Sequence, residues 1–165
     1  AAWLPAMLQS WGMPDEQAGW MLSYVQMGQV PIMLIGPLLA GKMKNQTALI
    51  WVTSVLLLGG LMMIVIWKTK YIVLAVLLVG IAAGLAYALA MMFFVLRTRN
   101  IPESAALSGM SQSVGYFIAA CGPPLFGVLY GWTSSWLLPL FLLVLAAIIL
   151  LFTGLSAAKD RHVSE

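Results

Sequence analysis

SGMSQSVGYFIAACGPPLFGVLYG, residues 108–131, is the stretch of the chain that decides the fold. It is apolar enough to cross a bilayer, yet it contains a Gln, three Ser, five Gly and two consecutive Pro. A helix that only faces lipid is built from Leu, Ile, Val and Phe, because lipid offers polar groups no partners. The stretch therefore predicts a membrane helix that borders something more polar than lipid.

The composition of the whole chain points to the same environment. Of the 165 residues, 62% are hydrophobic and only 8% are charged, with a mean hydropathy of +1.00. Soluble domains carry roughly 45–50% apolar and about 25% charged residues. The chain is therefore expected to be an integral membrane protein with lipid around it. Its net charge of +3 does not indicate a nucleic-acid partner, because the basic residues sit in pairs between long apolar runs.

The apolar runs predict an all-α fold, a polytopic bundle of transmembrane helices. A span needs roughly 20 mostly apolar residues. Five full runs and one partial run at the start are expected, at about 18–41, 47–67, 71–96, 104–130, 136–158 and 1–11. The chain opens in apolar sequence without an initial Met, which favours a fragment whose first helix is truncated.

Basic residues orient the predicted bundle. If the helices alternate in direction, one side holds six basic residues: Lys42, Lys44, Arg97, Arg99, Lys159 and Arg161. The other side holds only Lys68 and Lys70, together with the acidic pair Asp15 and Glu16. Loops rich in Lys and Arg stay in the cytoplasm. The C-terminus is therefore expected to be cytoplasmic.

Ionisable side chains are missing from the middle of every predicted span. An intramembrane ionisable residue usually marks a proton relay or a counter-charge. The single Cys121 and the tail residue His162 offer no metal set and no catalytic pair. We therefore expect no metal, no cofactor and no enzymatic activity.

Neutral polar residues in the run 18–41 are the first candidates for a function. Ser23, Gln26 and Gln29 follow one another at intervals of three and share one arc of a helix, with Tyr24 and Pro31 beside it. A buried unpaired amide costs a few kcal/mol. These residues either hydrogen-bond to neighbouring helices or line a cavity.

The run 71–96 contains two glycines at a spacing of four, Gly80 and Gly84. Small residues at this spacing let two helices approach closely, so packing is the expected role. Tyr87 follows on the same general face and is a candidate for the lining of a cavity.

The run 104–130 carries the strongest polar pattern. Ser104, Ser108 and Gln112 recur at intervals of four, and Ser111 and Tyr116 lie beside them. Such a row covers roughly 12 Å of helix. It predicts a helix that faces a solute pathway.

Gly122, Pro123 and Pro124 follow this row. Each Pro removes a backbone donor and clashes with the carbonyl four residues earlier, so the helix should bend or break here. A bend would let one end of the helix tilt, as a gate requires.

Six of the seven Trp lie near predicted helix ends, where the headgroup region favours their rings. They are Trp11, Trp20, Trp51, Trp67, Trp132 and Trp136, and most are expected to be interfacial anchors. Trp3 lies deeper and could line a cavity.

Two stretches resemble the C-terminal half of a major facilitator superfamily transporter, and most closely its cyanate permease and nitroimidazole transporter branch. One is Arg97-Thr98-Arg99 with the following SAALSGMSQSVGYFIAACGPPLFGVLYGWTSSW, and MLSYVQMGQVP at 21–31 supports it. The resemblance covers the whole chain and implies that its segments are helices seven to twelve of that fold. The N-terminal six-helix half would then be absent and would be the partner of this chain.

Two motifs of the superfamily are present in altered form. Gly36, Leu38 and Lys44 match the cytoplasmic-loop motif G-x-L-x-D with its basic residues, but Ala40 replaces the acid. Residues 122–127 are similar to the antiporter motif G-P-x-x-G-G, with Phe126 in place of one Gly. Neither a charge relay nor antiport follows from them.

The resemblance also implies a function. The protein would transport a small solute, such as a cyanate-like anion or a small heterocycle, by alternating access in a bacterial inner membrane. The alternative is a complete six-helix protein that acts as a homodimeric carrier or channel.

Overall fold

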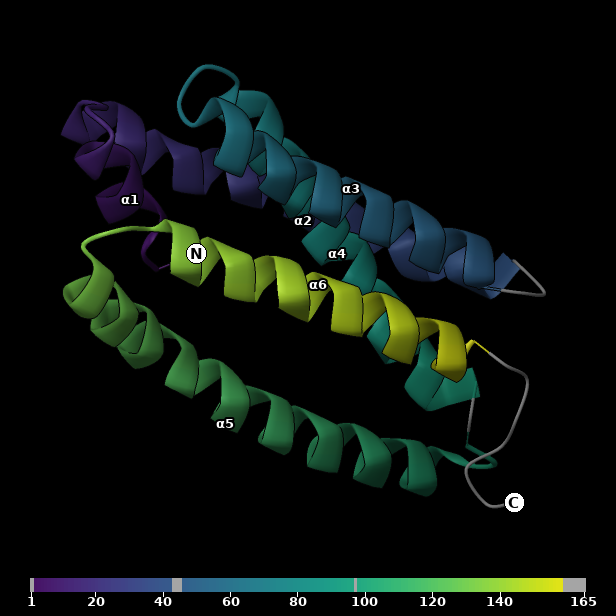
Figure 1. Ribbon diagram of the computed structural model, residues 1–165. Helices are drawn as coiled ribbons and strands as arrows, with labels where there is room; N and C mark the ends of the chain where they lie inside the picture. The colour runs from purple at the N-terminus through teal and green to yellow at the C-terminus, as the bar shows by residue number, and fades with distance from the viewer. Residues whose placement is uncertain (1, 43–45, 97, 159–165) are drawn as a thin grey trace.

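The computed structural model describes residues 2–42, 46–96 and 98–158. These residues form six α-helices, and the five long ones lie side by side along a common direction (Figure 1). The helices are α1 (Leu4–Ser10), α2 (Asp15–Lys42), α3 (Thr47–Trp67), α4 (Ile72–Leu96), α5 (Ile101–Thr133) and α6 (Leu137–Ala157). The all-α bundle predicted from the sequence is confirmed.

The predicted boundaries hold best where apolar residues alone define the helix. Helix α3 begins and ends as predicted, α4 begins one residue later than predicted, and α6 is one residue shorter than predicted at each end. Helix α2 begins three residues early, with Asp15 and Glu16 in its first turn. Acidic residues there interact favourably with the helix dipole.

Helix α5 is longer than predicted at both ends because specific residues cap it. At its start, the Asn100 side chain accepts a hydrogen bond from the Glu103 backbone N–H at 2.9 Å. Glu103 in return accepts hydrogen bonds from the Asn100 amide at 2.8 Å and from the Arg99 backbone N–H at 3.1 Å. Such a reciprocal cap satisfies donors that have no partner within the helix. At the other end, Ser134 stops the helix in the left-handed conformation with φ +48°.

Four helices in the described part of the chain are long and apolar enough to cross a membrane, namely α3, α4, α5 and α6. The sequence predicts a fifth full span at 18–41, and the 28 residues of α2 cover it. The side chains of residues 39, 40 and 42 in this helix are not described, so the fifth span stays a prediction.

Helices α2 and α4 form the tightest crossing in the bundle, and glycines lie at their contact. A Cβ added at Gly28 would lie 2.8 Å from the carbonyl oxygen of Leu77 on α4. A Cβ added at Gly84 would lie 2.6 Å from the carbonyl oxygen of Gln29, and Gly80 faces the carbonyl of Val25 in the same way. The packing role predicted for Gly80 and Gly84 is confirmed.

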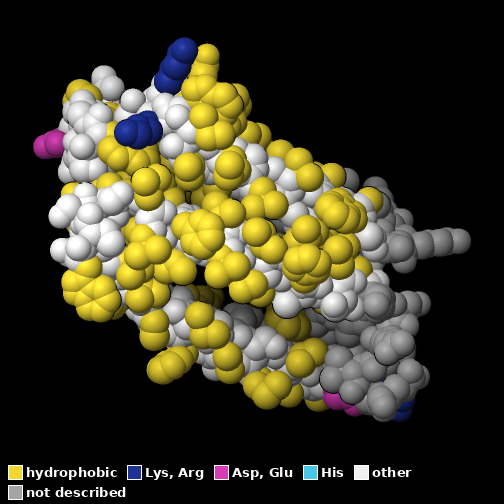
Figure 2. Space-filling model, in the orientation of Figure 1, with side chains coloured by type: hydrophobic (Ala, Val, Ile, Leu, Met, Phe, Trp, Pro, Cys, Tyr) yellow, Lys and Arg dark blue, Asp and Glu magenta, His cyan; other side chains and the backbone are white. Residues whose placement is uncertain are grey.

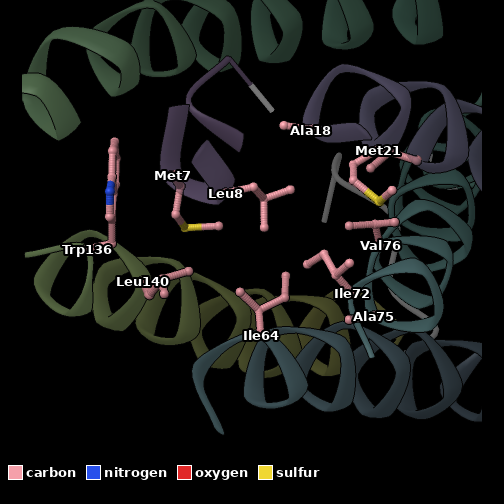
Figure 3. Packing of buried hydrophobic residues seen from close by; sticks show 11 residues of the cluster. Met7, Leu8, Ala18, Met21, Ile64, Ile72, Ala75, Val76, Trp136 and Leu140 are labelled. Carbon is pink, nitrogen blue, oxygen red and sulfur yellow. The ribbon is translucent and has the colours of Figure 1, made fainter. Parts of the chain in front are cut away.

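Leu8 of α1 lies at the centre of the main apolar core and is fully buried (Figure 3). Around it, Met21 comes from α2, Ile64 from α3, Val76 from α4 and Leu140 from α6. The short α1 is therefore held by four of the long helices. Helix α5 contributes no buried residue to this core.

The visible surface is mostly apolar, and charged side chains gather at its two ends (Figure 2). Among the exposed charged residues, Lys68 and Lys70 lie in the α3–α4 connection, and Arg99 and Glu103 lie at the start of α5. Figure 1 places these two connections at opposite ends of the bundle. An apolar belt between two charged ends is the pattern expected of a membrane-spanning bundle.

Candidate solute pathway

A cavity of about 430 Å³ lies inside the bundle, and residues from all six helices or their first flanking positions line it. Its lining includes Gln29 from α2, Ala83 from α4 and Phe126 from α5. Trp3, before α1, and Trp136, before α6, contribute two large aromatic surfaces. The surface is hollowed between α5 and α6 (Figure 2). Trp3, which the sequence suggested could line a cavity, lies in the wall of this one.

Trp3 connects the start of the chain to the middle of α5. Its indole N–H donates a hydrogen bond of 2.8 Å to the backbone carbonyl of Pro123. The ring lies against Gly127, where an added Cβ would come within 3.2 Å of the indole. Gly127 is therefore needed for this contact, because a larger side chain would displace the ring.

Trp136 occupies the other aromatic wall and is fixed by three neighbours. Its indole N–H donates to the Ser10 hydroxyl at 2.8 Å, and its ring stacks on Tyr130 with centroids 4.3 Å apart. The Trp3 ring lies 5.9 Å from it in a tilted arrangement. Trp136 is only 5% exposed, and Ser10 gives its N–H a partner inside the protein. The interfacial role expected of most of the six Trp stays a prediction.

The two consecutive prolines lie within α5 and do not break it. The helix runs without interruption from Ile101 to Thr133 and follows a curved path (Figure 1). Pro123 and Pro124 cannot donate to the carbonyls of Ala119 and Ala120, four residues earlier. Gly122, Pro123 and Ala119 all line the cavity. A gate at this point stays a prediction.

The polar row on α5 exists as predicted, but it runs outside this cavity. The Gln112 amide donates to the Ser108 hydroxyl at 2.8 Å, which joins two members of the row. Ser108, Ser111 and Gln112 are half-buried, whereas Tyr116 is 66% exposed. None of these four lines the cavity.

A second hollow of about 590 Å³ lies between the C-terminal end of α4 and the start of α5. Ser104 and Ser108 line it, together with Arg99 and Asn100 of the connection and Phe94 of α4. The polar row therefore begins in a recess at one end of the bundle, and Ser108, Ser111 and Gln112 lie on the less exposed side of α5.

The candidates on α2 are divided by the structure. Gln29 lines the cavity, whereas Ser23 and Gln26 are exposed on the same helix. Pro31 is exposed and lies inside α2, which continues past it. Tyr87 of α4 is 39% exposed and lines neither hollow.

The residues of the altered loop motif lie mostly within α2 rather than in a loop. Gly36 is buried against Ala88 of α4, and Leu38 is exposed on the last turns of α2. The resemblance assigns this motif to a cytoplasmic loop, but α2 continues through Pro31 and Pro37 to Lys42. Lys44 lies outside the described residues.

Most of the lining residues were missed by the sequence reasoning, among them the aromatic residues Phe126 and Trp136. Phe126 was noted only as the residue that replaces a motif glycine. Its position three residues after Pro123 was an available signal, because residues at that spacing share a helix face. No sequence pattern indicated that Trp136 would meet Ser10, more than a hundred residues away.

Comparison with known proteins identifies the relatives of this chain. The model of the Major Facilitator Superfamily matches residues 1–165. The uncharacterized transporter YycB of Bacillus subtilis (strain 168) is 36% identical over 99% of this chain, and the 2-nitroimidazole transporter of Escherichia coli (strain K12) is 32% identical over 98% of it. A protein of Thauera aromatica, provisionally named as an anionic 4-hydroxy-benzoate permease, is 37% identical over 68% of the chain and 68% of its own length.

The chain spans 41% of the length of the Bacillus and Escherichia proteins. No solved structure is significantly similar to it. The family match covers every helix described above, and the named relatives are transporters or permeases. Together with the apolar helical bundle, these matches show that the chain is an integral membrane protein and a member of the major facilitator superfamily.

Proposed function

We propose that this chain is the C-terminal six-helix half of a transporter that carries a small solute by alternating access. It would supply one wall of the pathway, and an N-terminal half would supply the other, as in transporters built from two repeated bundles. The chain's coverage of 41% of two full-length relatives supports this division. Helices α1 to α6 would then be the seventh to the twelfth helix.

A small planar ring compound is the substrate class that the relatives favour. The names of two of them contain 2-nitroimidazole and 4-hydroxy-benzoate, both of which are flat rings with polar substituents. A cyanate-like anion has no such support. We therefore propose a small ring compound, such as a heterocycle, as the solute.

The polar row on α5 carries the proposal for the pathway. Helix α5 buries no residue within the described part of the chain, so Tyr116, which is 66% exposed, and the exposed part of Gln112 face lipid, water or another part of the protein. Lipid would leave amide and hydroxyl groups without adequate partners, at a cost of roughly 2–7 kcal/mol each. A wet pathway between two halves satisfies them. Ser108, Ser111, Gln112 and Tyr116 would line it from α5, and Ser23, Gln26, Gln29 and Tyr87 would line it from α2 and α4.

The orientation of the bundle is part of the same proposal. Arg99 lies at one end of the described bundle, and Lys68 and Lys70 lie at the other. The remaining basic residues that weigh on this assignment lie outside the described residues or have undescribed side chains. We propose that the Arg99 end faces the cytoplasm of a bacterial cell, with the C-terminus on that side of the inner membrane.

The pathway is tested by scanning residues 104–116 with cysteine in the full-length transporter. The native Cys121 is exposed and is first replaced by Ser, as are any other cysteines. A membrane-impermeant thiosulfonate reagent is then applied during turnover. Cysteines at 104, 108, 111, 112, 115 and 116 should react, and the solute should slow their labelling, because these positions share one face of α5.

Cysteines at Met110 and Phe117 are the matched controls, because both side chains are exposed on the opposite face of α5. They should remain unlabelled, since the reagent does not enter lipid. If the whole row resists the reagent while uptake is normal, the row faces dry protein and the proposed pathway is wrong.

A further inference from the structure

The cavity among the six helices has the size and the chemical character of a small-molecule site. Its volume of about 430 Å³ lies within the range of about 300–1,000 Å³ that is usual for ligand pockets. Apolar and aromatic side chains form most of its wall. Among the described lining residues, Gln29 contributes an amide side chain. Such pockets use a few polar groups to orient a ligand that is otherwise held by apolar contacts.

The charge of the occupant follows from the lining. None of the described residues around this cavity is an Asp, Glu, Lys, Arg or His. An ion placed there would lose its hydration without gaining a counter-charge, which costs far more than transfer of a neutral group. The cavity therefore discriminates against anions and cations and favours a neutral molecule.

The shape of the occupant follows from the aromatic walls. Trp3, Phe126 and Trp136 present three ring systems to the cavity. Both indole N–H groups are already used within the protein, by the Pro123 carbonyl and by the Ser10 hydroxyl. The indoles are held in place by these bonds and can offer only their ring surfaces. Flat aromatic molecules pack well against such surfaces.

Two positions in the cavity can offer polar contacts to an occupant. The Gln29 side chain makes no hydrogen bond to another described residue, so its amide can donate to a ligand and accept from one. Pro123 leaves the Ala119 carbonyl without its donor in the helix, and Ala119 also lines the cavity. A ligand with one donor and one acceptor can satisfy both.

From these contacts we propose that the cavity is a binding site for a neutral planar ring compound that carries a hydrogen-bonding group. Gln29 is its specificity-determining residue, and Trp3 and Phe126 contact the ring. The inference rests on the proposed function, because it makes this cavity a site for the transported solute. It adds that the solute enters as a neutral molecule and that part of its site lies inside the C-terminal half.

Benzamide and benzoate test the proposal because they have nearly the same shape and differ in charge. Binding of each is measured by titration calorimetry with the purified full-length transporter in detergent. Benzamide should bind at least tenfold more tightly than benzoate. Cyclohexanecarboxamide, which is neutral but not flat, should bind more weakly than benzamide. Benzoate binding as tight as benzamide, or equal binding of the flat and non-flat amides, would overturn the proposal.

Two substitutions locate the bound benzamide. Gln29→Leu should weaken benzamide binding about tenfold, since a hydrogen bond is lost in an apolar site. Gln17→Leu is the matched control on the same helix. Gln17 is exposed outside the cavity, so this variant should bind benzamide with unchanged affinity. Phe126→Leu should weaken binding severalfold through lost ring contact and is small enough to keep the fold. Unchanged affinity in both Gln29→Leu and Phe126→Leu would exclude this cavity.

Uptake is measured separately in vesicles, so the two proposals can fail independently. Solute uptake without benzamide binding at Gln29 would leave the transport proposal intact and remove the cavity site. Benzamide binding at Gln29 without uptake of any neutral ring compound would keep the site and overturn its part in transport.

Discussion

The α2–α4 pair and helix α5 are both rich in glycine, but their glycines lie in different surroundings. On α2 and α4, Gly28, Gly80 and Gly84 lie where the two backbones touch, so no side chain would fit. On α5, Gly109, Gly115 and Gly122 have no neighbouring helix within 4 Å of an added Cβ, and no residue of the helix is buried. Glycine at a contact fixes two helices together. Glycine away from any contact leaves a helix free to move or to meet a partner.

The largest effect is expected from adding a methyl group at the tight crossing. Gly28→Ala would place a Cβ 2.8 Å from the Leu77 carbonyl and should lower the free energy of unfolding by about 1–3 kcal/mol. Thermal unfolding of the purified transporter measures it. Gly109→Ala on α5 is the control and should keep or raise stability, because Ala favours helix more than Gly does. Equal losses in both variants would remove the distinction between the two regions.

The next effect concerns the polar row that α5 leaves outside the core. Gln112→Ala removes the amide that bonds to Ser108 and should lower uptake about tenfold at unchanged membrane expression. Tyr116→Ala should act in the same direction. Ser113→Ala is the matched control, because Ser113 lies outside the row and its hydroxyl bonds to the Gly109 carbonyl. Normal uptake by both row variants would assign the row to packing.

A smaller effect is expected from the prolines that curve α5. Replacing Pro123 and Pro124 by Ala restores donors for the Ala119 and Ala120 carbonyls and stiffens the helix. The double variant should fold, reach the membrane and turn over severalfold more slowly, on the order of 1 kcal/mol in the barrier. Initial uptake rates at saturating solute measure it. A double variant that works at full speed would show that the curve serves packing alone.

The smallest effect is expected on stability, from the buried residue Ser54 of α3. Its hydroxyl is buried and has no hydrogen-bond partner among the described residues. Ser54→Ala removes this unsatisfied group and should raise stability by up to about 1 kcal/mol. Its neighbour Thr53 donates to the Leu49 carbonyl at 2.7 Å, so Thr53→Val should lower stability slightly. A loss of stability in Ser54→Ala would reveal a partner for the hydroxyl.

The scaffold was the predictable part of this molecule because local patterns determine it. Apolar runs predicted the helices, and the Gly80–Gly84 spacing predicted a close crossing. The early start of α5 was also readable, since Asn100 and Glu103 stand at the spacing of a reciprocal cap. A boundary drawn from hydropathy alone begins this helix too late, because the capping residues Asn100 and Glu103 are polar.

The cavity was harder to predict because it depends on contacts between distant residues. The hydrogen bond from Trp3 to Pro123 and that from Trp136 to Ser10 each join residues more than a hundred positions apart. Periodicity within one helix showed that Gln29 and Gln26 share an arc, but only the packing of α2 against α4 decided which of them lines the cavity.

The cap at Asn100 and Glu103 has a mechanical consequence for α5. The first turn of the helix is completed by residues of its own segment, so none of its polar groups depends on α4. A tilt of α5 about this turn would leave the cap of Asn100 and Glu103 intact. The same tilt would be opposed halfway along the helix, where the Trp3 indole holds the Pro123 carbonyl.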